Sequence, residues 1–209
     1  MTLVLLVRHA VTDVTGKRLY GRSPGISLSE AGRAQADRLA ERLSSVRLAA
    51  VYSSPIERCL ETAAPVASTH RLRVQRIEDL LEIDYGRWTG RAFGSLARTR
   101  LWRRVHGGNP SAARFPGGET LAEAQRRGVA AMERIAEWHP RAAVAVVTHG
   151  DMVALLLAYF GGIHVDLFQR IEVAPASVSA MSIGEGVPRI RRINDTGTLE
   201  DLITRRVRG

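Results

Sequence analysis

The stretch LVLLVRHA, residues 3–10, decides the fold of this chain. Five consecutive apolar residues are typical of a strand that is buried on both faces of a parallel sheet. Charge follows at once in Arg8 and His9, where the strand ends. Ligands of open parallel sheets bind beyond the carboxyl ends of the strands. The stretch therefore predicts a central strand and, at its end, the edge of the sheet that carries function.

Strands and helices alternate along the rest of the chain. Ser27 with Glu30, Ser54 with Glu57, and Thr120 with Glu123 have the spacing of a capping box, so each pair predicts a helix start. We expect further strands over 48–52, 71–77 and 142–147, helices over 27–44, 54–69, 120–138 and 151–160, a weak helix over 93–105, a loop over 107–118, and a terminal pair of strands over 177–183 and 188–193. This order predicts an α/β fold, a three-layer α/β/α sandwich with a mostly parallel central sheet flanked by helices.

The length and composition are those of a globular protein. The chain has 209 residues, of which 45% are hydrophobic and 24% charged, so we expect a single domain over 1–209, with a flexible tail from about residue 200. Cys59 is the only cysteine, which excludes an intrachain disulfide. The apolar runs 1–7 and 152–162 are too short to span a membrane or to serve as a signal segment. We expect a soluble, cytoplasmic protein without a membrane partner.

The formal net charge of +9 has two interpretations. A nucleic-acid-binding protein would place a basic stripe against phosphates, whereas an enzyme would gather a few arginines around an anionic substrate. The arginines are scattered along the whole chain, Lys17 is the only lysine, and no aromatic residues interleave the basic clusters. This distribution favours an anionic substrate, so we expect no nucleic-acid partner.

Polar residues follow each predicted strand. Arg8 and His9 end the first strand, Arg58 lies one turn into the helix after the second, Glu82 follows the third, and His149 ends the fourth. Each residue alone has an ordinary structural explanation. Together they would meet at one edge of the sheet, which favours a functional site.

Other site motifs are absent from the sequence. It contains no GxxxxGK[ST] loop, no GxGxxG fingerprint, no HExxH pair and no Cys/His cluster with ligand spacing. We therefore expect neither a metal nor an organic cofactor. Cys59 lies inside a predicted helix, and we interpret it as a packed side chain.

Several segments together resemble the histidine phosphatase superfamily, also called the phosphoglycerate mutase-like family. The segment LVRHAVT at 6–12 resembles its Arg-His-Gly-x-Thr signature, with Ala10 where glycine is usual. The other matching segments are 20–22, 27–32, 52–55 with Arg58 and Thr62, 82–90, 116–120 and 147–150. The resemblance covers roughly residues 3–199.

The resemblance implies a role for each matching residue. His9 would be the nucleophile that becomes phosphohistidine, Arg8, Arg58 and His149 would line the phosphate pocket, and Glu82 would be the general acid. It also places Thr15, Gly21 and Gly150 beside the substrate, although Thr15 stands where many members have asparagine. Asp84 and Glu119 remain competitors for the acid role. Asp84 lies on the same side of an extended stretch as Glu82, and Glu119 stands near a helix start.

The implied activity is that of a phosphomonoester hydrolase acting on a small phosphorylated metabolite. A phosphoglycerate-type mutase is the first alternative, but the segment 91–118 is short and lacks the proline-rich insertion of the mutases. Its arginines would either recognise an anionic substrate or form a solvated face. A non-catalytic module that binds a phosphorylated ligand is the second alternative, and a homodimer is left open.

Overall fold

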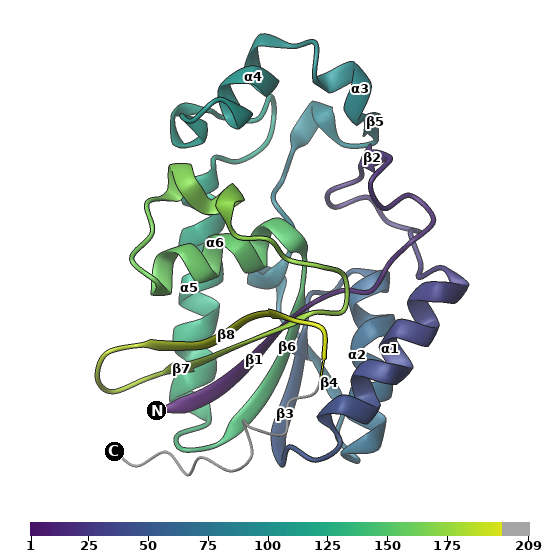
Figure 1. Ribbon diagram of the computed structural model, residues 1–209, viewed down its shortest axis with the longest axis vertical. Coiled ribbons are helices and arrows are strands. Elements are labelled where there is room, and N and C mark those ends of the chain that lie inside the picture. The colour runs from purple at the N-terminus through teal and green to yellow at the C-terminus, as the bar shows by residue number, and fades with distance from the viewer. Residues whose placement is uncertain (198–209) are drawn as a thin grey trace.

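A six-stranded mixed sheet, in the order β4-β3-β6-β1-β7-β8, forms the centre of the computed structural model, which describes residues 1–197 (Figure 1). Its strands are β1 (Thr2–Arg8), β3 (Leu48–Ser53), β4 (Val74–Arg76), β6 (Ala143–Thr148), β7 (Val178–Ile183) and β8 (Arg189–Asp195). The first four run parallel to one another, and β7 and β8 add an antiparallel hairpin. The predicted α/β/α sandwich with a mostly parallel sheet is confirmed. A separate two-stranded sheet joins β2 (Arg18–Leu19) to β5 (Arg91–Ala92).

Helices cover both faces of the sheet, which explains the continuous apolar run of β1. Val4 and Leu6 pack into one core cluster, and Leu5 and Val7 pack into a second cluster on the opposite face. The helices are α1 (Glu30–Leu43), α2 (Glu57–Thr69), α3 (Phe93–Leu96), α4 (Arg100–His106), α5 (Leu121–Trp138) and α6 (Gly150–Phe160). Helices α1 and α2 lie on the Leu5 face, and α5 and α6 on the Val4 face (Figure 1).

Only one of the three predicted capping boxes is confirmed. Thr120 and Glu123 form both reciprocal hydrogen bonds at the start of α5. The prediction for α1 is wrong by two residues, because Ser29 is the N-cap and accepts from the Gly32 N–H. The prediction for α2 is also wrong: the helix begins at Glu57, without a side-chain cap. The Ser54 hydroxyl instead contacts His149, as described below.

Other predicted boundaries shift for local reasons. Strand β4 is shorter than the predicted 71–77, because Arg71 has a left-handed φ of 56° and its N–H donates to the Ser68 carbonyl, so it belongs to the turn that ends α2. The weak helix over 93–105 divides into α3 and α4, and a 3₁₀ turn at Pro110–Ala112 interrupts the predicted loop. The predicted tail from residue 200 lies outside the described residues. Within residues 1–197, no helix combines the length and the apolar character needed to cross a membrane.

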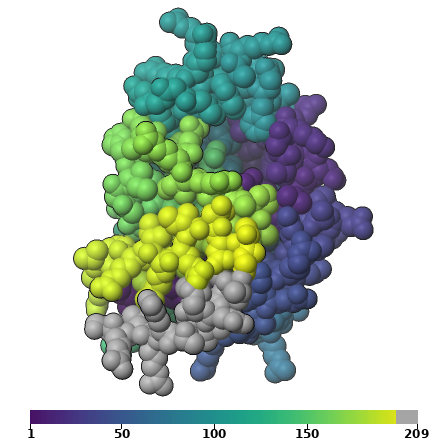
Figure 2. Space-filling view, in the orientation of Figure 1, coloured from purple at the N-terminus to yellow at the C-terminus, as the bar shows by residue number. Residues whose placement is uncertain are grey.

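Residues 91–118 form what we call the cover segment. It contains β5, α3 and α4 and lies beyond the carboxyl ends of the parallel strands, at the top of Figure 1. Figure 2 shows the surface hollowed beneath it, between the N-terminal residues in purple and the green residues that follow α6.

Candidate active site

The site lies where three neighbouring parallel strands end. The His9 N–H donates to the Thr148 carbonyl at 2.8 Å and the Ser54 N–H to the Val147 carbonyl at 2.9 Å, so the ends of β1, β3 and β6 are held in register. A cavity of about 360 Å³ opens at this edge. Five of the sequence-predicted site residues line it, namely Arg8, His9, Gly21, Glu82 and Gly150.

The hydrogen bonds of His9 fix which ring nitrogen is available. Its Nδ1 lies 2.7 Å from the Ala10 carbonyl, which can only accept, so Nδ1 carries the proton. Nε2 therefore presents a lone pair, and the Arg58 Nε lies 3.3 Å from it. Burial, then Arg58 and Arg8, lower the pKa of His9 to about 3, because each disfavours the imidazolium. A buried, neutral imidazole whose Nε2 carries no proton and accepts only a long hydrogen bond from the Arg58 Nε–H is suited to nucleophilic attack.

Two arginines keep unpaired donors beside His9. Arg58 is fully buried, donates to the Gly21 carbonyl and stacks 4.7 Å from the centre of the Tyr20 ring. Arg8 donates to the Val173 carbonyl at 2.6 Å. Among the described residues, the buried Arg58 Nη1 and Arg8 Nε have no hydrogen-bond partner. Buried guanidinium donors without partners are costly, and an oxyanion bound between them would satisfy both.

His149 lies against both of these groups. Its ring centre is 5.4 Å from that of His9, and the rings meet edge to face. The Arg58 Nη2 lies 3.1 Å from Nδ1, which must accept, so the proton sits on Nε2 and faces the Ser54 hydroxyl at 2.8 Å. Burial and then Arg58 hold the pKa of His149 well below its usual value. In this tautomer His149 orients Arg58, and it would have to gain a proton on Nδ1 before donating to an anion there.

Glu82 is one of two carboxyl groups that line the cavity. It is 9% exposed, and one of its oxygens accepts from the Ile83 N–H at 3.0 Å. Burial, followed by the charge of Asp151, raises the pKa of Glu82 to about 7. Asp151 lies in the first turn of α6, lines the same cavity and accepts a hydrogen bond from the Tyr85 hydroxyl. A carboxyl group that titrates near neutrality can both donate and accept a proton.

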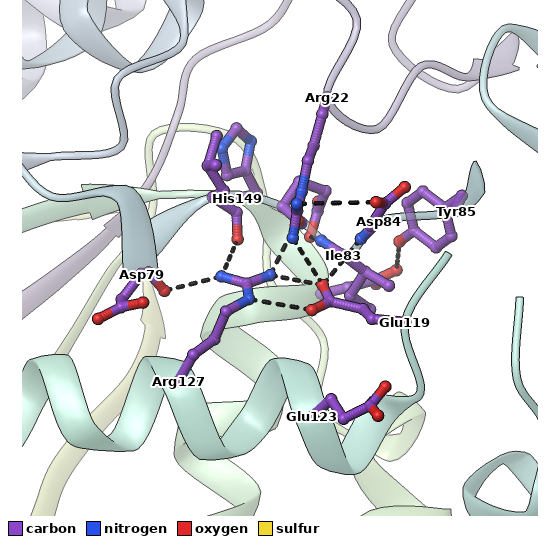
Figure 3. Close-up of polar contacts among 12 residues, drawn as sticks. Arg22, Asp79, Ile83, Asp84, Tyr85, Glu119, Glu123, Arg127 and His149 are labelled. Carbon is purple, nitrogen blue, oxygen red and sulfur yellow. Dashed lines mark hydrogen bonds and ion pairs between the residues drawn. The ribbon is translucent and has the colours of Figure 1, made fainter. Parts of the chain in front are cut away.

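A polar network holds the backbone around Glu82 (Figure 3). All five N–H groups of Arg127, on α5, are used: they bind the carbonyls of Asp79, Leu81 and Glu82 and both carboxylate oxygens of Glu119. Arg22 donates to the Glu82 carbonyl at 2.8 Å and to Glu119 at 2.9 Å. The network fixes the loop that carries Glu82 without contacting its carboxyl group.

The two competing acids have other partners. Asp84 accepts from the Gly86 N–H at 2.9 Å and lies 3.8 Å from Arg22, outside the residues that line the cavity. Glu119 is bound by Arg22 and Arg127 and accepts from the Asp84 N–H. Both carboxylates therefore support the loop, and of the three candidates for the acid role Glu82 alone lines the cavity.

The remaining predicted residues have backbone or packing contacts. The Thr15 hydroxyl accepts from the Thr12 N–H at 2.9 Å, so it closes its own turn. Gly150 lets the Arg8 side chain approach, because a Cβ there would lie 3.0 Å from the Arg8 Nε. Cys59 is fully buried and 3.5 Å from the His149 Nε2, and burial raises its pKa, which agrees with the packed role expected for it.

Sequence reasoning missed Asp151, Tyr85 and the Arg127 network. For Asp151 a signal was present, because it directly follows His149 and Gly150 at a strand end. For Arg127 there was none, since it is one of many arginines and its partners are mostly backbone carbonyls. Among the described residues, no group of three or more His, Cys, Asp or Glu side chains could hold a metal ion.

The comparisons with known proteins agree with the geometry. Residues 4–196 match the histidine phosphatase superfamily (branch 1). Phosphoserine phosphatase 1 of Hydrogenobacter thermophilus is 29% identical over 201 residues, which cover 94% of this chain and 93% of that protein. A bifunctional protein of Mycobacterium tuberculosis is 31% identical over 205 residues, 95% of this chain, which spans 55% of that protein's length. The solved structure of YhfR from Bacillus stearothermophilus superposes with a TM-score of 0.88 at 28% identity, covering 94% of this chain and 98% of YhfR.

Proposed function

The chain belongs to the histidine phosphatase superfamily, and from this premise we propose that it hydrolyses phosphomonoesters of small metabolites through a phosphohistidine on His9. The observation that carries the proposal is the arrangement at His9. The Arg58 Nε lies 3.3 Å from the unprotonated Nε2, and Arg8 and Arg58 each keep one buried N–H donor without a partner among the described residues. Such a pocket is suited to a phosphoryl group and places a nucleophile against it.

In the first half-reaction the Nε2 lone pair of His9 attacks phosphorus and the bond from phosphorus to the ester oxygen breaks. Arg8 and Arg58 neutralise the charge on the non-bridging oxygens. The leaving oxygen takes a proton from Glu82, whose raised pKa keeps a substantial fraction protonated near neutral pH. The Nδ1 proton stays in its hydrogen bond to the Ala10 carbonyl, which stabilises the positive ring of the intermediate.

In the second half-reaction water replaces the alcohol. The Glu82 carboxylate takes a proton from this water as its oxygen attacks phosphorus, the bond between Nε2 and phosphorus breaks, and the electron pair returns to Nε2. Inorganic phosphate leaves, and Glu82 is protonated again. The chain's own side chains carry every step, so we propose that the reaction needs neither a metal nor an organic cofactor.

Phosphatase is preferred to mutase because of the cover segment. A mutase must hold a second phosphate on the far side of the cavity. There the cover segment contributes Phe93, Trp102, Val105, His106 and Phe115 to the lining. None of its arginines lines the cavity, and Arg114 is paired with Glu123. These arginines therefore fit the solvated face better than substrate recognition.

The domain organisation, cellular location and partners of the enzyme are also proposals. We propose that residues 1–209 act as one domain in the cytoplasm on a small phosphorylated metabolite, without a nucleic-acid or membrane partner. Sedimentation of the purified protein tests for a homodimer.

A trapping experiment tests the proposed function. Wild-type protein is mixed with a ³²P-labelled phosphomonoester and quenched within milliseconds in alkali. We expect label on the protein that survives alkali, is released by acid, and is absent in His9→Gln. Turnover without such label would exclude the phosphohistidine route. Incubation of 3-phosphoglycerate with a 2,3-bisphosphoglycerate primer tests the mutase alternative, and we expect no 2-phosphoglycerate.

A further inference from the structure

The cavity extends beyond the phosphate-binding groups into an outer part that we call the vestibule. Its wall consists of aromatic side chains, Tyr85, Trp88, Phe93, Trp102, His106 and Phe115, which all line the cavity. They form a connected series: between ring centres, Phe115 lies 4.9 Å from Tyr85 and 5.5 Å from Trp88, Trp88 lies 6.0 Å from Trp102, and Trp102 stacks on His106 at 3.8 Å. A wall of this kind binds flat, apolar groups through their faces and edges.

One carboxylate faces the vestibule. Asp151 is fixed by the Tyr85 hydroxyl, which donates to its Oδ2. No hydrogen bond from residues 1–197 reaches its Oδ1, which is therefore available to a ligand. The proposed reaction does not use Asp151, yet it lines the same cavity as Glu82.

The other charged groups of the cavity lining leave Asp151 without a cationic partner. Arg8 belongs to the phosphate pocket. Arg18 is exposed and donates to the Gly90 carbonyl at 3.1 Å, and His106 is exposed on the cover segment. The leaving group of a substrate would thus meet an aromatic wall and two acidic side chains, Glu82 and Asp151.

We infer that the leaving group is an aromatic or similarly flat apolar alcohol that carries a cation or an N–H donor, which Asp151 binds. The inference rests on the proposed phosphatase function and names its substrate class. A leaving group with a carboxylate, as in 3-phosphoglycerate, would bring a second negative charge beside Asp151, and like charges repel. O-phosphoserine carries both an ammonium and a carboxylate but has no apolar surface for the wall.

A matched series of substrates tests this inference without any variant. The esters are 4-(aminomethyl)benzyl, 4-methylbenzyl and 4-carboxybenzyl phosphate, which differ mainly in the charge of a remote group, with O-phosphoserine as the non-aromatic comparison. We expect kcat/KM of the wild type to fall from the aminomethyl to the methyl to the carboxy ester. The difference between the aminomethyl and carboxy esters should be at least about tenfold. An equal or higher kcat/KM for the carboxy ester would overturn the inference.

Variants then locate the selectivity. Asp151→Asn also changes the surroundings of Glu82, but this affects all three esters alike, so the ratio between esters isolates the substrate contact. We expect the aminomethyl-to-carboxy ratio to fall about tenfold in Asp151→Asn and to be retained in Asp151→Glu. Trp102→Ala should lower kcat/KM for the three benzyl esters severalfold more than it lowers kcat/KM for O-phosphoserine.

The outcomes separate this inference from the proposed function. If the wild type hydrolyses the esters but does not discriminate among them, or if Asp151→Asn keeps the wild-type ratio, the substrate class is wrong and the phosphatase stands. If the wild type hydrolyses none of the four esters and forms no phosphohistidine, the proposed function fails, and the inference fails with it.

Discussion

The phosphate pocket and the vestibule share one cavity but are built differently. His9, Arg58 and His149 are at most 2% exposed, and the register of three buried strands holds them in place. The outer wall of the vestibule comes from the cover segment, where α3 and α4 are short and Trp102 is only half-buried. The pocket is thus built on the strands of the main sheet, whereas the outer wall of the vestibule is connected to the rest of the chain by the short β2–β5 pairing, a few loop hydrogen bonds and side-chain packing.

This difference assigns separate tasks to the two regions. Changes in the pocket should alter the rate for every substrate, because every substrate presents the same phosphoryl group. Changes in the vestibule should alter the ratio between substrates. The following predictions test this division, from the largest expected effect to the smallest.

Replacing the nucleophile should have the largest effect. We expect His9→Ala to lower kcat by ~10⁴-fold or more for all phosphomonoesters, because no other side chain can form the covalent intermediate. Phosphate release and circular dichroism measure activity and fold. His70→Ala is the matched control, since the His70 ring bonds to the Leu43 carbonyl at 3.1 Å and does not line the cavity. A His9→Ala enzyme that keeps a few per cent of wild-type activity would contradict the assignment.

Removing the acid should separate substrates by leaving group. Glu82→Gln should slow alkyl phosphates by ~10²–10⁴-fold, because a poor leaving group needs a proton as the bond breaks. It should slow 4-nitrophenyl phosphate much less, since nitrophenolate leaves without one. Asp84→Asn is the control and should leave this contrast unchanged. The acid role would move to Asp84 if that variant reproduced the pattern instead.

The strand ends explain why so much of the site could be predicted. The apolar run before Arg8 requires a buried strand, parallel strands bring their carboxyl ends to one edge, and polar residues that follow such strands must therefore meet there. The fold follows from the same alternation. The backbone structure that a short segment adopts can therefore be predicted from its own sequence pattern.

The predictions that were wrong or missing concern side chains whose partners lie far away in the sequence. Ser54 has the spacing of a helix cap, but its hydroxyl contacts His149, which is 95 positions away in the chain. Arg127 and Asp151 act through partners that only the folded chain brings near, namely the carbonyls around Glu82 and the Tyr85 hydroxyl. Local patterns cannot show such contacts, because tertiary partners decide which of several hydrogen bonds a side chain makes.

The pH dependence of kcat/KM should follow the protonation of Glu82. Glu82 must be protonated to serve as the acid, so kcat/KM for an alkyl phosphate should fall about tenfold per pH unit above its pKa of about 7. His9, with a pKa of about 3, stays neutral over the whole working range and adds no limb there. Asp151→Asn removes a negative charge that raises the pKa of Glu82, so the falling limb should move to lower pH. A limb at the same pH in that variant would show that Asp151 does not influence the acid.

The support behind the acid should have a smaller effect. Arg127→Lys keeps the charge but offers three donors in place of five, so the loop around Glu82 loses part of its anchorage. We expect kcat for alkyl phosphates to fall about tenfold, with KM nearly unchanged, and the unfolding free energy to fall by ~1–3 kcal/mol. Arg126→Lys, at the exposed neighbouring position, is the control. An equal loss on 4-nitrophenyl phosphate would mean that Arg127 supports the whole pocket rather than the acid.

Chelation should have no effect at all. Many enzymes that transfer phosphoryl groups use divalent ions to neutralise the phosphate oxygens. Here Arg8 and Arg58 supply two fixed positive charges at that point, matching the charge of a phosphomonoester dianion, and both keep a buried N–H without a partner among the described residues. Activity after exhaustive dialysis against EDTA should equal that of untreated enzyme. Arg58→Lys is the comparison variant, because it keeps the positive charge and loses the bidentate geometry. If EDTA abolished activity and only a divalent ion restored it, the arginines would not be sufficient, and the view of the pocket as a site complete in its own side chains would be wrong.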